Sequence, residues 1–499
     1  MSDAGTAPGA AVDSFIADAR ATGAQPMITI PTIGWIAKLG ANRDKLASFS
    51  VAKYGAQTQT DPWMPDAGNG IRTNGTKITG NDPNDANTRN SPAHQTAWVN
   101  HLKTKWGAAN AGGVRLYVMD NETSLWHETH RDVHPAGQTM EESRDGIIAY
   151  SAAVRAADPN AVIVGPEEWG WSGYLLSGAD QKWSNENKIY WNQPDKVAHG
   201  GADYLPWLLA QLKANDAATG KKSLNIFTVH YYPQGGEFWS SDTSAAMQQR
   251  RNRSTRSLWD PNYVDETWIN DKVRLVPRLK QWVNENYPGL QTGITEYSWG
   301  AENHINGATA QADILGIFGR EGLDMANRWQ VPASGSLTFK AMQLYRNYDG
   351  QKSTFGDVSV QTVSDANADN LAVFASQRTK DGALTVMAVS KVLSGTTPLK
   401  INVAGVSSNI AQVWQLSSSG NISRAADIAV TSNVLQTTLP PQTITLFVFA
   451  NATGTKAPTI KFSNPLNNSA LRALTTISGT ATDDVQVARV ALYIQAQLR

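Results

Sequence analysis

Short runs of apolar and β-branched residues alternate with helical patterns from about residue 10 to about residue 340. The strand-like runs are 27–33, 114–119, 161–165, 224–230, 292–296 and 323–329. Between them lie helical patterns, including 11–21, 144–157, 204–215 and 268–284. This alternation predicts a mostly parallel sheet with helices packed outside it. The α/β pattern favours a (β/α)8 barrel, although six strands are counted and two more would be needed.

The pattern changes from about residue 355, where alternating strands follow one another without helices. Strands at 371–377 and 383–390 flank the turn signal Lys380-Asp381-Gly382, and more strand patterns follow as far as 449. We therefore predict an N-terminally incomplete barrel at 1–345 and an antiparallel β-sandwich at 346–452. Residues 453–499 are predicted to form a linker and the start of a further β-rich module, which stops inside a strand-like segment.

Composition excludes several kinds of protein. Lys+Arg and Asp+Glu each number 43, so the formal net charge is zero, which argues against a nucleic-acid partner or a polybasic membrane protein. The chain has no cysteine, which excludes disulfides, thiolate catalysis and cysteine-ligated metals. No apolar run reaches 18 residues, so no membrane-spanning helix is predicted.

Tryptophan is in clear excess, with 17 residues. Many of these lie at or just beyond the ends of predicted strands: Trp35, Trp126, Trp169, Trp171, Trp299 and Trp329. Trp259 and Trp268 lie in or next to a polar insertion at 235–266. Pyranose rings pack on aromatic faces, so the set predicts a long saccharide cleft, while core packing remains the alternative for any single ring.

Two glutamates are the strongest candidates for catalysis. Glu122 follows the strand at 114–119 next to Asn121, and Glu296 ends the strand at 292–296. Carboxyl ends of parallel strands meet at one face of a barrel, so these side chains can face one another. A retaining glycosidase needs two carboxyls about 5–5.5 Å apart, and a neighbouring amide can bind the sugar 2-hydroxyl.

The segment Val229-His-Tyr-Tyr-Pro233 ends the strand between the two glutamates. A tyrosine here, such as Tyr231, is predicted to donate a hydrogen bond to the nucleophile, with His230 supporting that network. A buried aromatic pair is the alternative.

Two clusters raise the question of a metal. His127, His130 and His134 share one helix face, but no His-Glu-x-x-His pattern occurs and Pro135 interrupts the helix, so a sugar-contacting or structural role is favoured over zinc. The turn Asn81-Asp-Pro-Asn-Asp85 offers Asp82 and Asp85 as ligands for a structural calcium, or forms an ordinary polar turn.

The segment from Asp120 to Pro135 resembles glycoside hydrolase family 44, endo-acting β-1,4-glucanases and xyloglucanases with a (β/α)8 barrel and a β-sandwich. Further family-like stretches are 28–35, 165–171, 228–233, 256–261, 295–304 and 316–322. The resemblance implies that Glu122 is the acid/base and Glu296 the nucleophile of a retaining mechanism. It also implies that Tyr231, Tyr297, His130, His230 and the tryptophans line the cleft, and that a calcium ion is present.

The chain departs from the family pattern in two places. Thr123 stands where family members have proline, a change that affects only the shape of the turn. The family's first two strands, which normally precede the run at 27–33, are absent, and this matches the count of six. The tail from Pro458 resembles the start of an immunoglobulin-like module of secreted bacterial enzymes.

We therefore expect a fragment of a secreted bacterial protein. Its predicted activity is that of a monomeric, retaining endo-β-1,4-glucanase that acts on cellulose-type β-glucans, xyloglucan or both, with no cofactor needed for catalysis. A retaining mannanase or xylanase remains an alternative, since the same carboxylates serve any equatorial β-1,4 backbone. A non-catalytic glucan-binding fragment is the other alternative, since an incomplete barrel exposes edge strands.

Overall fold

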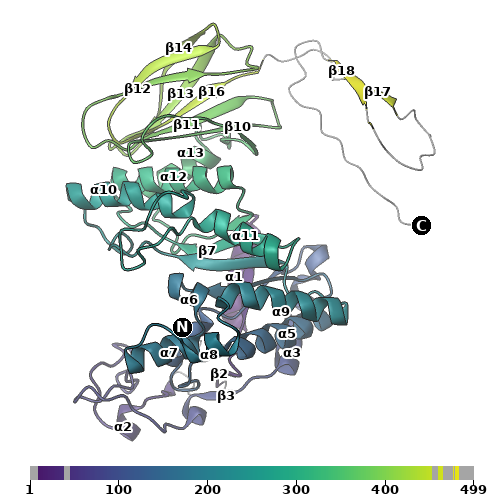
Figure 1. Cartoon of the computed structure of the whole chain (residues 1–499), viewed down its shortest axis with the longest axis vertical. Helices are drawn as coiled ribbons and strands as arrows, with labels where there is room; N and C mark the ends of the chain where they lie inside the picture. Colours follow the sequence, from purple (N-terminus) through teal and green to yellow (C-terminus); the bar gives the residue numbers. More distant parts are fainter. Residues whose placement is uncertain (1–8, 39–44, 452–458, 465–475, 477, 483–499) are drawn as a thin grey trace. The chain divides into compact units, whose positions relative to one another are not determined.

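The computed structural model describes residues 9–38, 45–451, 459–464, 476 and 478–482. Its contacts group the chain into two compact units that alternate along the sequence (Figure 1). The first unit is Met1–Tyr232, Leu275–Ser298 and Leu323–Gln330, and the second is Pro233–Arg274, Trp299–Gly322 and Val331–Arg499. The boundaries at 345 and 452 stay predictions.

The first unit is built on a six-stranded parallel sheet, which confirms the predicted α/β class and all six strand positions. The order is β1-β4-β5-β6-β7-β8, and each strand is parallel to its neighbours. The strands are β1 (Met27–Ile30), β4 (Leu116–Met119), β5 (Val162–Glu168), β6 (Ile226–Tyr231), β7 (Gln291–Tyr297) and β8 (Met325–Ala326). All their carboxyl ends therefore lie along one edge of the sheet, where the candidate glutamates were expected.

Helices connect these strands and pack against one another in series. In order of contact, the main ones are α3 (Pro92–Trp106), α5 (Met140–Ala157), α9 (Tyr204–Thr219) and α11 (Leu275–Asn286). The helix expected at 268–284 begins only at Leu275, because Asn270 and Arg274 adopt positive φ angles of 45° and 36° that a helix does not allow. Shorter elements of this unit are α1 (Ala10–Ala21), β2 (Trp35–Ala37), α2 (Val51–Tyr54), β3 (Asn87–Arg89), α4 (Trp126–Thr129), α6 (Trp171–Leu175), α7 (Gly178–Asn187) and α8 (Pro194–Ala198).

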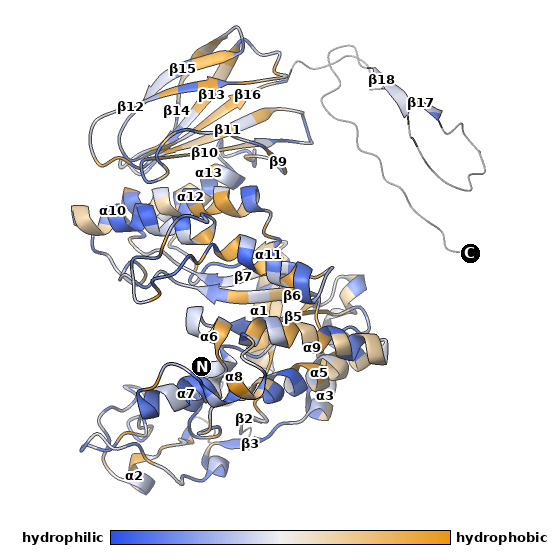
Figure 2. Ribbon diagram, in the orientation of Figure 1, coloured by the Kyte–Doolittle hydropathy of each residue, from blue (hydrophilic) through white to orange (hydrophobic). Residues whose placement is uncertain are grey.

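The second unit contains the predicted antiparallel β-structure as an eight-stranded sheet, in the order β12-β15-β14-β13-β16-β11-β10-β9. Its strands are β9 (Val358–Val360), β10 (Leu371–Gln377), β11 (Leu384–Ser390), β12 (Thr397–Asn402), β13 (Ile410–Leu416), β14 (Ile422–Thr431), β15 (Val434–Leu439) and β16 (Thr443–Phe449). Strand β16 is buried along its whole length. Its residues are mostly hydrophobic, as the colouring of Figure 2 shows. It holds the sheet's two apolar clusters together, since it contributes residues to both.

One face of this sheet is covered by α12 (Ile305–Glu321) and α13 (Leu337–Arg346), whose buried residues share a core cluster with β11, β13 and β16. A buried ion pair between Lys391 Nζ and Asp313, at 2.8 Å, joins the sheet to α12. Helix α10 (Ala245–Ser254) belongs to the same unit. Of the predicted tail module, the described part is the antiparallel pair β17 (Thr459–Asn464) and β18 (Ser478–Thr482), and the remainder lies outside the described residues. None of the described helices is long and apolar enough to cross a bilayer.

Candidate active site

Glu122 is presented by a tight turn directly after β4. Asp120 and Glu122 both have positive φ, at 63° and 46°. The buried Asp120 carboxylate accepts hydrogen bonds from the backbone N–H groups of Thr32 and Ile33, which joins this turn to the end of β1. The Glu122 N–H donates to the Glu167 carbonyl oxygen at 3.0 Å. These bonds fix the backbone, and the Glu122 side chain remains partly exposed, at 24%.

Glu296 lies near the end of β7, in register with His230 on β6. The hydroxyl of Tyr232 donates to Glu296 Oε2 at 2.7 Å. Burial raises the pKa of Glu296, while the positive charge of His230 and the hydrogen bond from Tyr232 oppose that rise. Tyr232, and not Tyr231, therefore fills the role expected of a tyrosine in this segment, and the Tyr231 ring is buried.

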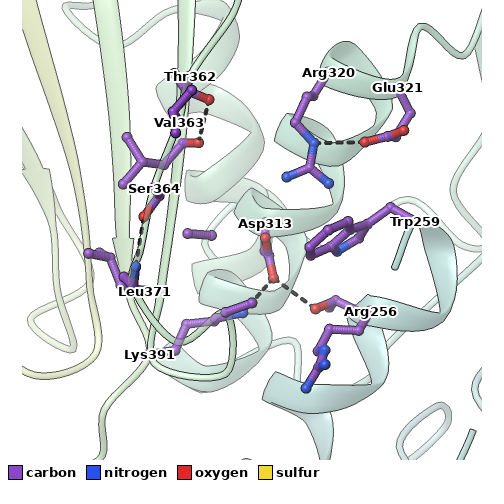
Figure 3. A pocket seen from close by; sticks show the side chains of 15 residues that line it. Arg256, Trp259, Asp313, Arg320, Glu321, Thr362, Val363, Ser364, Leu371 and Lys391 are labelled. Atoms are coloured by element: carbon purple, nitrogen blue, oxygen red, sulfur yellow. Dashed lines mark hydrogen bonds and ion pairs between the residues drawn. The ribbon is translucent and has the colours of Figure 1, made fainter. Parts of the chain in front are cut away.

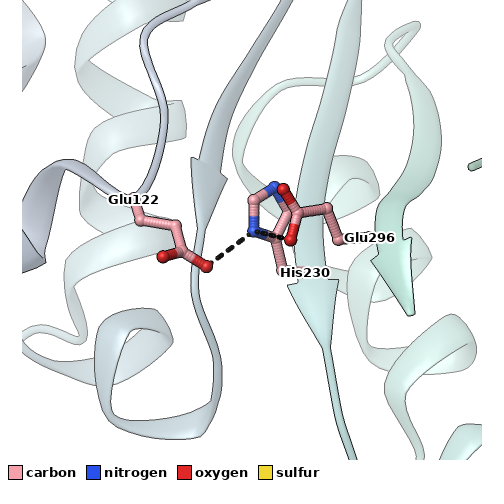
Figure 4. A group of neighbouring side chains, drawn as sticks. All are labelled: Glu122, His230 and Glu296. Atoms are coloured by element: carbon pink, nitrogen blue, oxygen red, sulfur yellow. Dashed lines mark hydrogen bonds and ion pairs between the residues drawn. The ribbon is translucent and has the colours of Figure 1, made fainter. Parts of the chain in front are cut away.

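His230 lies between the two glutamates (Figure 4). Its Nδ1 is 2.9 Å from Glu122 Oε1 and 3.5 Å from Glu296 Oε2. One atom of each of these three side chains lies within 4.8 Å of the others. The two carboxyl groups are thus as close as a retaining mechanism requires, and closer than the roughly 6.5–9.5 Å of inverting enzymes.

The His230 ring carries a positive charge in this setting. It is 1% exposed, and burial alone would lower the pKa of its imidazole. Hydrogen bonds with Glu122 and Glu167, together with the charges of Glu167 and Glu296, outweigh burial and raise the pKa of His230 to about 10. At neutral pH both ring nitrogens therefore hold a proton and donate.

Two buried carboxyl groups on β5, Glu167 and Glu168, were missed as site residues from the sequence. Glu167 Oε2 accepts from His230 Nε2 at 3.1 Å, and its carboxylate also accepts from the hydroxyls of Thr228 and Thr295. Glu168 faces the turn after β4, where it accepts from Thr123 Oγ1 at 3.0 Å and Ser124 Oγ at 2.6 Å. Their position at the carboxyl end of a predicted strand was the signal that could have found them.

Glu168 leads to a prediction about stability and pH. Burial raises its pKa from 4.5 to about 7, although the Ser124 and Thr123 hydroxyls favour the charged form. Between those two values the folded state holds a proton that the unfolded state has lost, so stability falls as pH rises through this window. At pH 8 we expect Glu168→Gln to gain about 3 °C or more in melting temperature over the wild type, and at pH 4 to gain nothing. Thermal denaturation followed by circular dichroism at both pH values measures this, and an equal gain at pH 4 would contradict it.

The aromatic residues predicted to line a cleft divide into buried and accessible rings. The buried rings, 8% exposed or less, are those of Trp35, Trp126, Trp171, Tyr231, Tyr297 and Trp299. Packing accounts for them: Arg89 covers the Trp35 ring at 3.9 Å, and Trp299 Nε1 donates to Ser254 Oγ at 3.0 Å. Trp329 is 42% exposed, Trp169 is half-buried, and Asn121 and His130 are exposed. In the first unit the accessible candidates for sugar contact are therefore Asn121, His130, Trp169 and Trp329.

Trp259 and Trp268 belong to the second unit. Trp259 lines a pocket of about 370 Å³ in which the guanidinium of Arg320 lies 4.2 Å from the ring centroid (Figure 3). One face of this ring is thus covered by a cation. Trp268 is 55% exposed, and its Nε1 donates to Gln234 Oε1 at 3.3 Å.

The predicted calcium ligands have protein partners. Lys53 Nζ lies 2.6 and 2.8 Å from the two oxygens of Asp85, and Asp82 Oδ1 accepts from the Asn84 N–H at 2.9 Å. Calcium at this turn stays a prediction. In the described part of the chain, the groups of three or more carboxylate and histidine side chains close enough to share an ion are Glu122–His230–Glu296 and Glu141–Asp195–His199. The three histidines at 127, 130 and 134 therefore form no such group.

Comparison with known proteins shows which families the chain is similar to. The model of glycoside hydrolase family 44 matches residues 3–235, and that of a bacterial immunoglobulin domain matches residues 458–498. CelM2, a bifunctional glucanase-xylanase from a metagenome library, has a solved structure that is 57% identical, with a TM-score of 0.88, over 91% of this chain and 87% of CelM2.

Two further relatives are more distant. A family 44 xyloglucanase from Paenibacillus polymyxa, solved with xyloglucan, is 28% identical with a TM-score of 0.72, over 89% of this chain and 84% of that one. Endoglucanase A of Paenibacillus lautus is 32% identical over 358 residues, which are 69% of this chain and 49% of the relative. The chain thus spans about half the length of that curated relative.

Proposed function

Since the chain belongs to glycoside hydrolase family 44, we propose that it is a secreted endo-β-1,4-glucanase that hydrolyses cellulose-type β-glucans, xyloglucan or both, with retention of configuration. The observation that carries this proposal is the pair of carboxyl groups at the ends of β4 and β7, with one oxygen of each within 4.8 Å of the other. That separation suits direct attack by one carboxylate, and leaves no room for a water between carboxyl and sugar as inversion requires.

The two glutamates act in turn. Glu122 donates its proton to the glycosidic oxygen while the bond from that oxygen to the anomeric carbon breaks. The Glu296 carboxylate attacks the anomeric carbon and forms a glycosyl ester. Glu122, now a carboxylate, takes a proton from water, the water oxygen attacks the anomeric carbon, and Glu296 is released. Tyr232 supports the second carboxyl by donating its hydroxyl hydrogen to Oε2 at 2.7 Å.

The names of the relatives support a glucan as substrate and also favour a second one. One relative is described as an endoglucanase and one as a xyloglucanase, and the 57% identical CelM2 as a glucanase-xylanase. Xylan shares the equatorial β-1,4 backbone of cellulose, so the same carboxyl pair can serve both. We therefore include β-1,4-xylan as the alternative substrate.

A substrate panel tests the proposal. We expect reducing ends to appear from carboxymethylcellulose and xyloglucan, and at a lower rate from xylan and mannan, which share the equatorial β-1,4 backbone. Viscosity is expected to fall faster than reducing ends appear, as endo-acting cleavage requires, and the first product observed by NMR should be the β-anomer. No release from any of the four polymers by a folded protein would contradict the proposed activity, and an α-anomer would contradict retention.

A further inference from the structure

The proposed reaction requires the two carboxyl groups to exchange charge states between its first and second steps. In the first step Glu296 must be the charged one, because it attacks, while Glu122 holds a proton. In the second step Glu296 is a neutral ester and Glu122 must be the charged one, because it activates water. A hydrogen-bond donor within reach of both carboxyl groups would stabilise the one that is negatively charged in each step.

His230 Nδ1 is placed as such a donor. It lies 2.9 Å from Glu122 Oε1 and 3.5 Å from Glu296 Oε2, so a small rotation of the ring or of one carboxylate exchanges the acceptor. The opposite nitrogen, Nε2, points away from both glutamates and donates to Glu167 at 3.1 Å. Glu167, whose side chain is 3% exposed, therefore binds the ring nitrogen that faces away from the two catalytic glutamates.

Glu167 is itself fixed by its surroundings. Its two oxygens accept from the hydroxyls of Thr228 on β6 and Thr295 on β7, and the Tyr174 hydroxyl on α6 donates to the His230 carbonyl oxygen. Every polar partner of this carboxylate is thus buried and comes from a strand of the sheet. Such an arrangement gives the imidazole a single orientation and a counter-charge at Nε2.

We propose that Glu167 is a positioning residue of the reaction, whose carboxylate holds the His230 ring so that the Nδ1–H serves Glu296 in the first step and Glu122 in the second. The inference rests on the proposed function, because it assigns a task to Glu167 only if those two glutamates catalyse. No proton leaves Nδ1 in either step, and only the acceptor of its hydrogen bond changes.

The charged and titratable groups around His230 come from five elements. They are Glu122 after β4, Glu167 on β5, Tyr174 on α6, Tyr232 after β6, and Glu296 on β7. Three of these are carboxyl groups that stabilise the imidazolium. Removing the charge of Glu167 is expected to lower the pKa of His230 from its raised value of about 10.

The first test is NMR titration of histidine labelled with ¹⁵N, with the His230 signals assigned by their loss in His230→Gln. In the wild type we expect His230 to remain doubly protonated to at least about pH 8, and Glu167→Gln to lower the midpoint by about two pH units or more. Glu168→Gln is the matched control, since it neutralises the adjacent buried carboxyl without touching His230, and its midpoint is expected to equal that of the wild type. A wild-type midpoint below about 7, or an unchanged midpoint in Glu167→Gln, would overturn the proposal.

The second test is kinetic. Glu167→Gln is expected to lower kcat on carboxymethylcellulose by about tenfold or more while KM changes less than about twofold, since Glu167 supports the histidine and not the substrate. The loss of kcat should grow as pH rises through the His230 midpoint of the variant. Above that midpoint the imidazole is neutral and has only one N–H, so Nδ1 no longer always carries the proton that it donates to a catalytic glutamate. A fall in kcat that is the same at every pH would mean a merely structural role. An inactive wild type whose His230 titrates as expected would instead contradict the proposed function alone.

Discussion

Glu296→Gln is expected to lower kcat on carboxymethylcellulose by about 10³- to 10⁵-fold. The amide has nearly the shape of the carboxylate but cannot form the glycosyl ester, so the reaction loses its nucleophile. Burial raises the pKa of the native carboxyl, while the positive charge of His230 and the hydrogen bond from Tyr232 both favour its charged form. Reducing-end release by the variant, at the pH optimum of the wild type, measures the loss.

Tyr232→Phe is the matched control for this variant. It removes only the hydroxyl that donates to Glu296 at 2.7 Å and leaves both carboxyl groups in place. A hydrogen bond to a charged group contributes about 1.5–3 kcal/mol. The kcat of the control is therefore expected to fall by roughly 10- to 100-fold, much less than the kcat of Glu296→Gln. Activity of Glu296→Gln within tenfold of the wild type, in a protein with an unchanged melting temperature, would exclude Glu296 as nucleophile.

The pairing of Glu122 with Glu296 could be predicted from the sequence because it depends on topology alone. Each glutamate follows a run of apolar and β-branched residues, and parallel strands bring all their carboxyl ends to one edge. The structure places Glu122 in the turn after β4 and Glu296 on β7, and His230 lies near the end of β6, which pairs with β7. No detail of packing was needed for that step.

Which of Tyr231 and Tyr232 donates to Glu296 depends on the alternation of side chains along the strand. Side chains alternate across a strand, so a tyrosine two residues after His230 lies on the same face as the histidine, and the one between them lies on the other. This puts the Tyr232 hydroxyl next to Glu296 and buries the Tyr231 ring. The period of two was available in the sequence, and it favours Tyr232.

The roles of Glu167 and Glu168 could not be derived from that alternation. Adjacent residues of a regular strand face opposite sides, yet both carboxyl groups are buried against site elements. The register of β5 shifts between Pro166 and Glu168, and Glu167 has a φ of 61°. Such a bulge redirects a side chain, and nothing in the pattern of apolar residues signals it.

The exposure of each tryptophan ring could not be predicted from the sequence. The excess of tryptophan predicts a long saccharide cleft, which stays a prediction, and the burial of a single ring depends on its tertiary neighbours. Trp126 is 1% exposed and packs against His134, whereas Trp329 is 42% exposed. Both lie at or beyond the end of a predicted strand, so position along the chain did not separate them.

Glu122→Gln is expected to show an effect that depends on the leaving group. On carboxymethylcellulose, whose leaving alcohol needs a proton, kcat should fall by about 10²- to 10⁴-fold. On an aryl β-cellobioside with an acidic phenol, formation of the glycosyl ester needs no proton and should stay fast. Hydrolysis of the ester still needs Glu122 as base, so the covalent intermediate should accumulate. A burst of phenol followed by slow turnover, and a mass increase on the peptide that contains Glu296, are the expected measurements.

Rescue by azide is the control for the assignment of Glu122 as acid/base and Glu296 as nucleophile. Azide attacks the anomeric carbon as an anion and needs no base, so it should restore turnover of the aryl substrate in Glu122→Ala and yield a β-glycosyl azide. It should leave Glu296→Gln inactive, because that variant forms no ester for azide to attack. The two variants therefore separate the two roles, and rescue of Glu296→Gln in place of Glu122→Ala, with the β-glycosyl azide as its product, would reverse the assignment of acid/base and nucleophile.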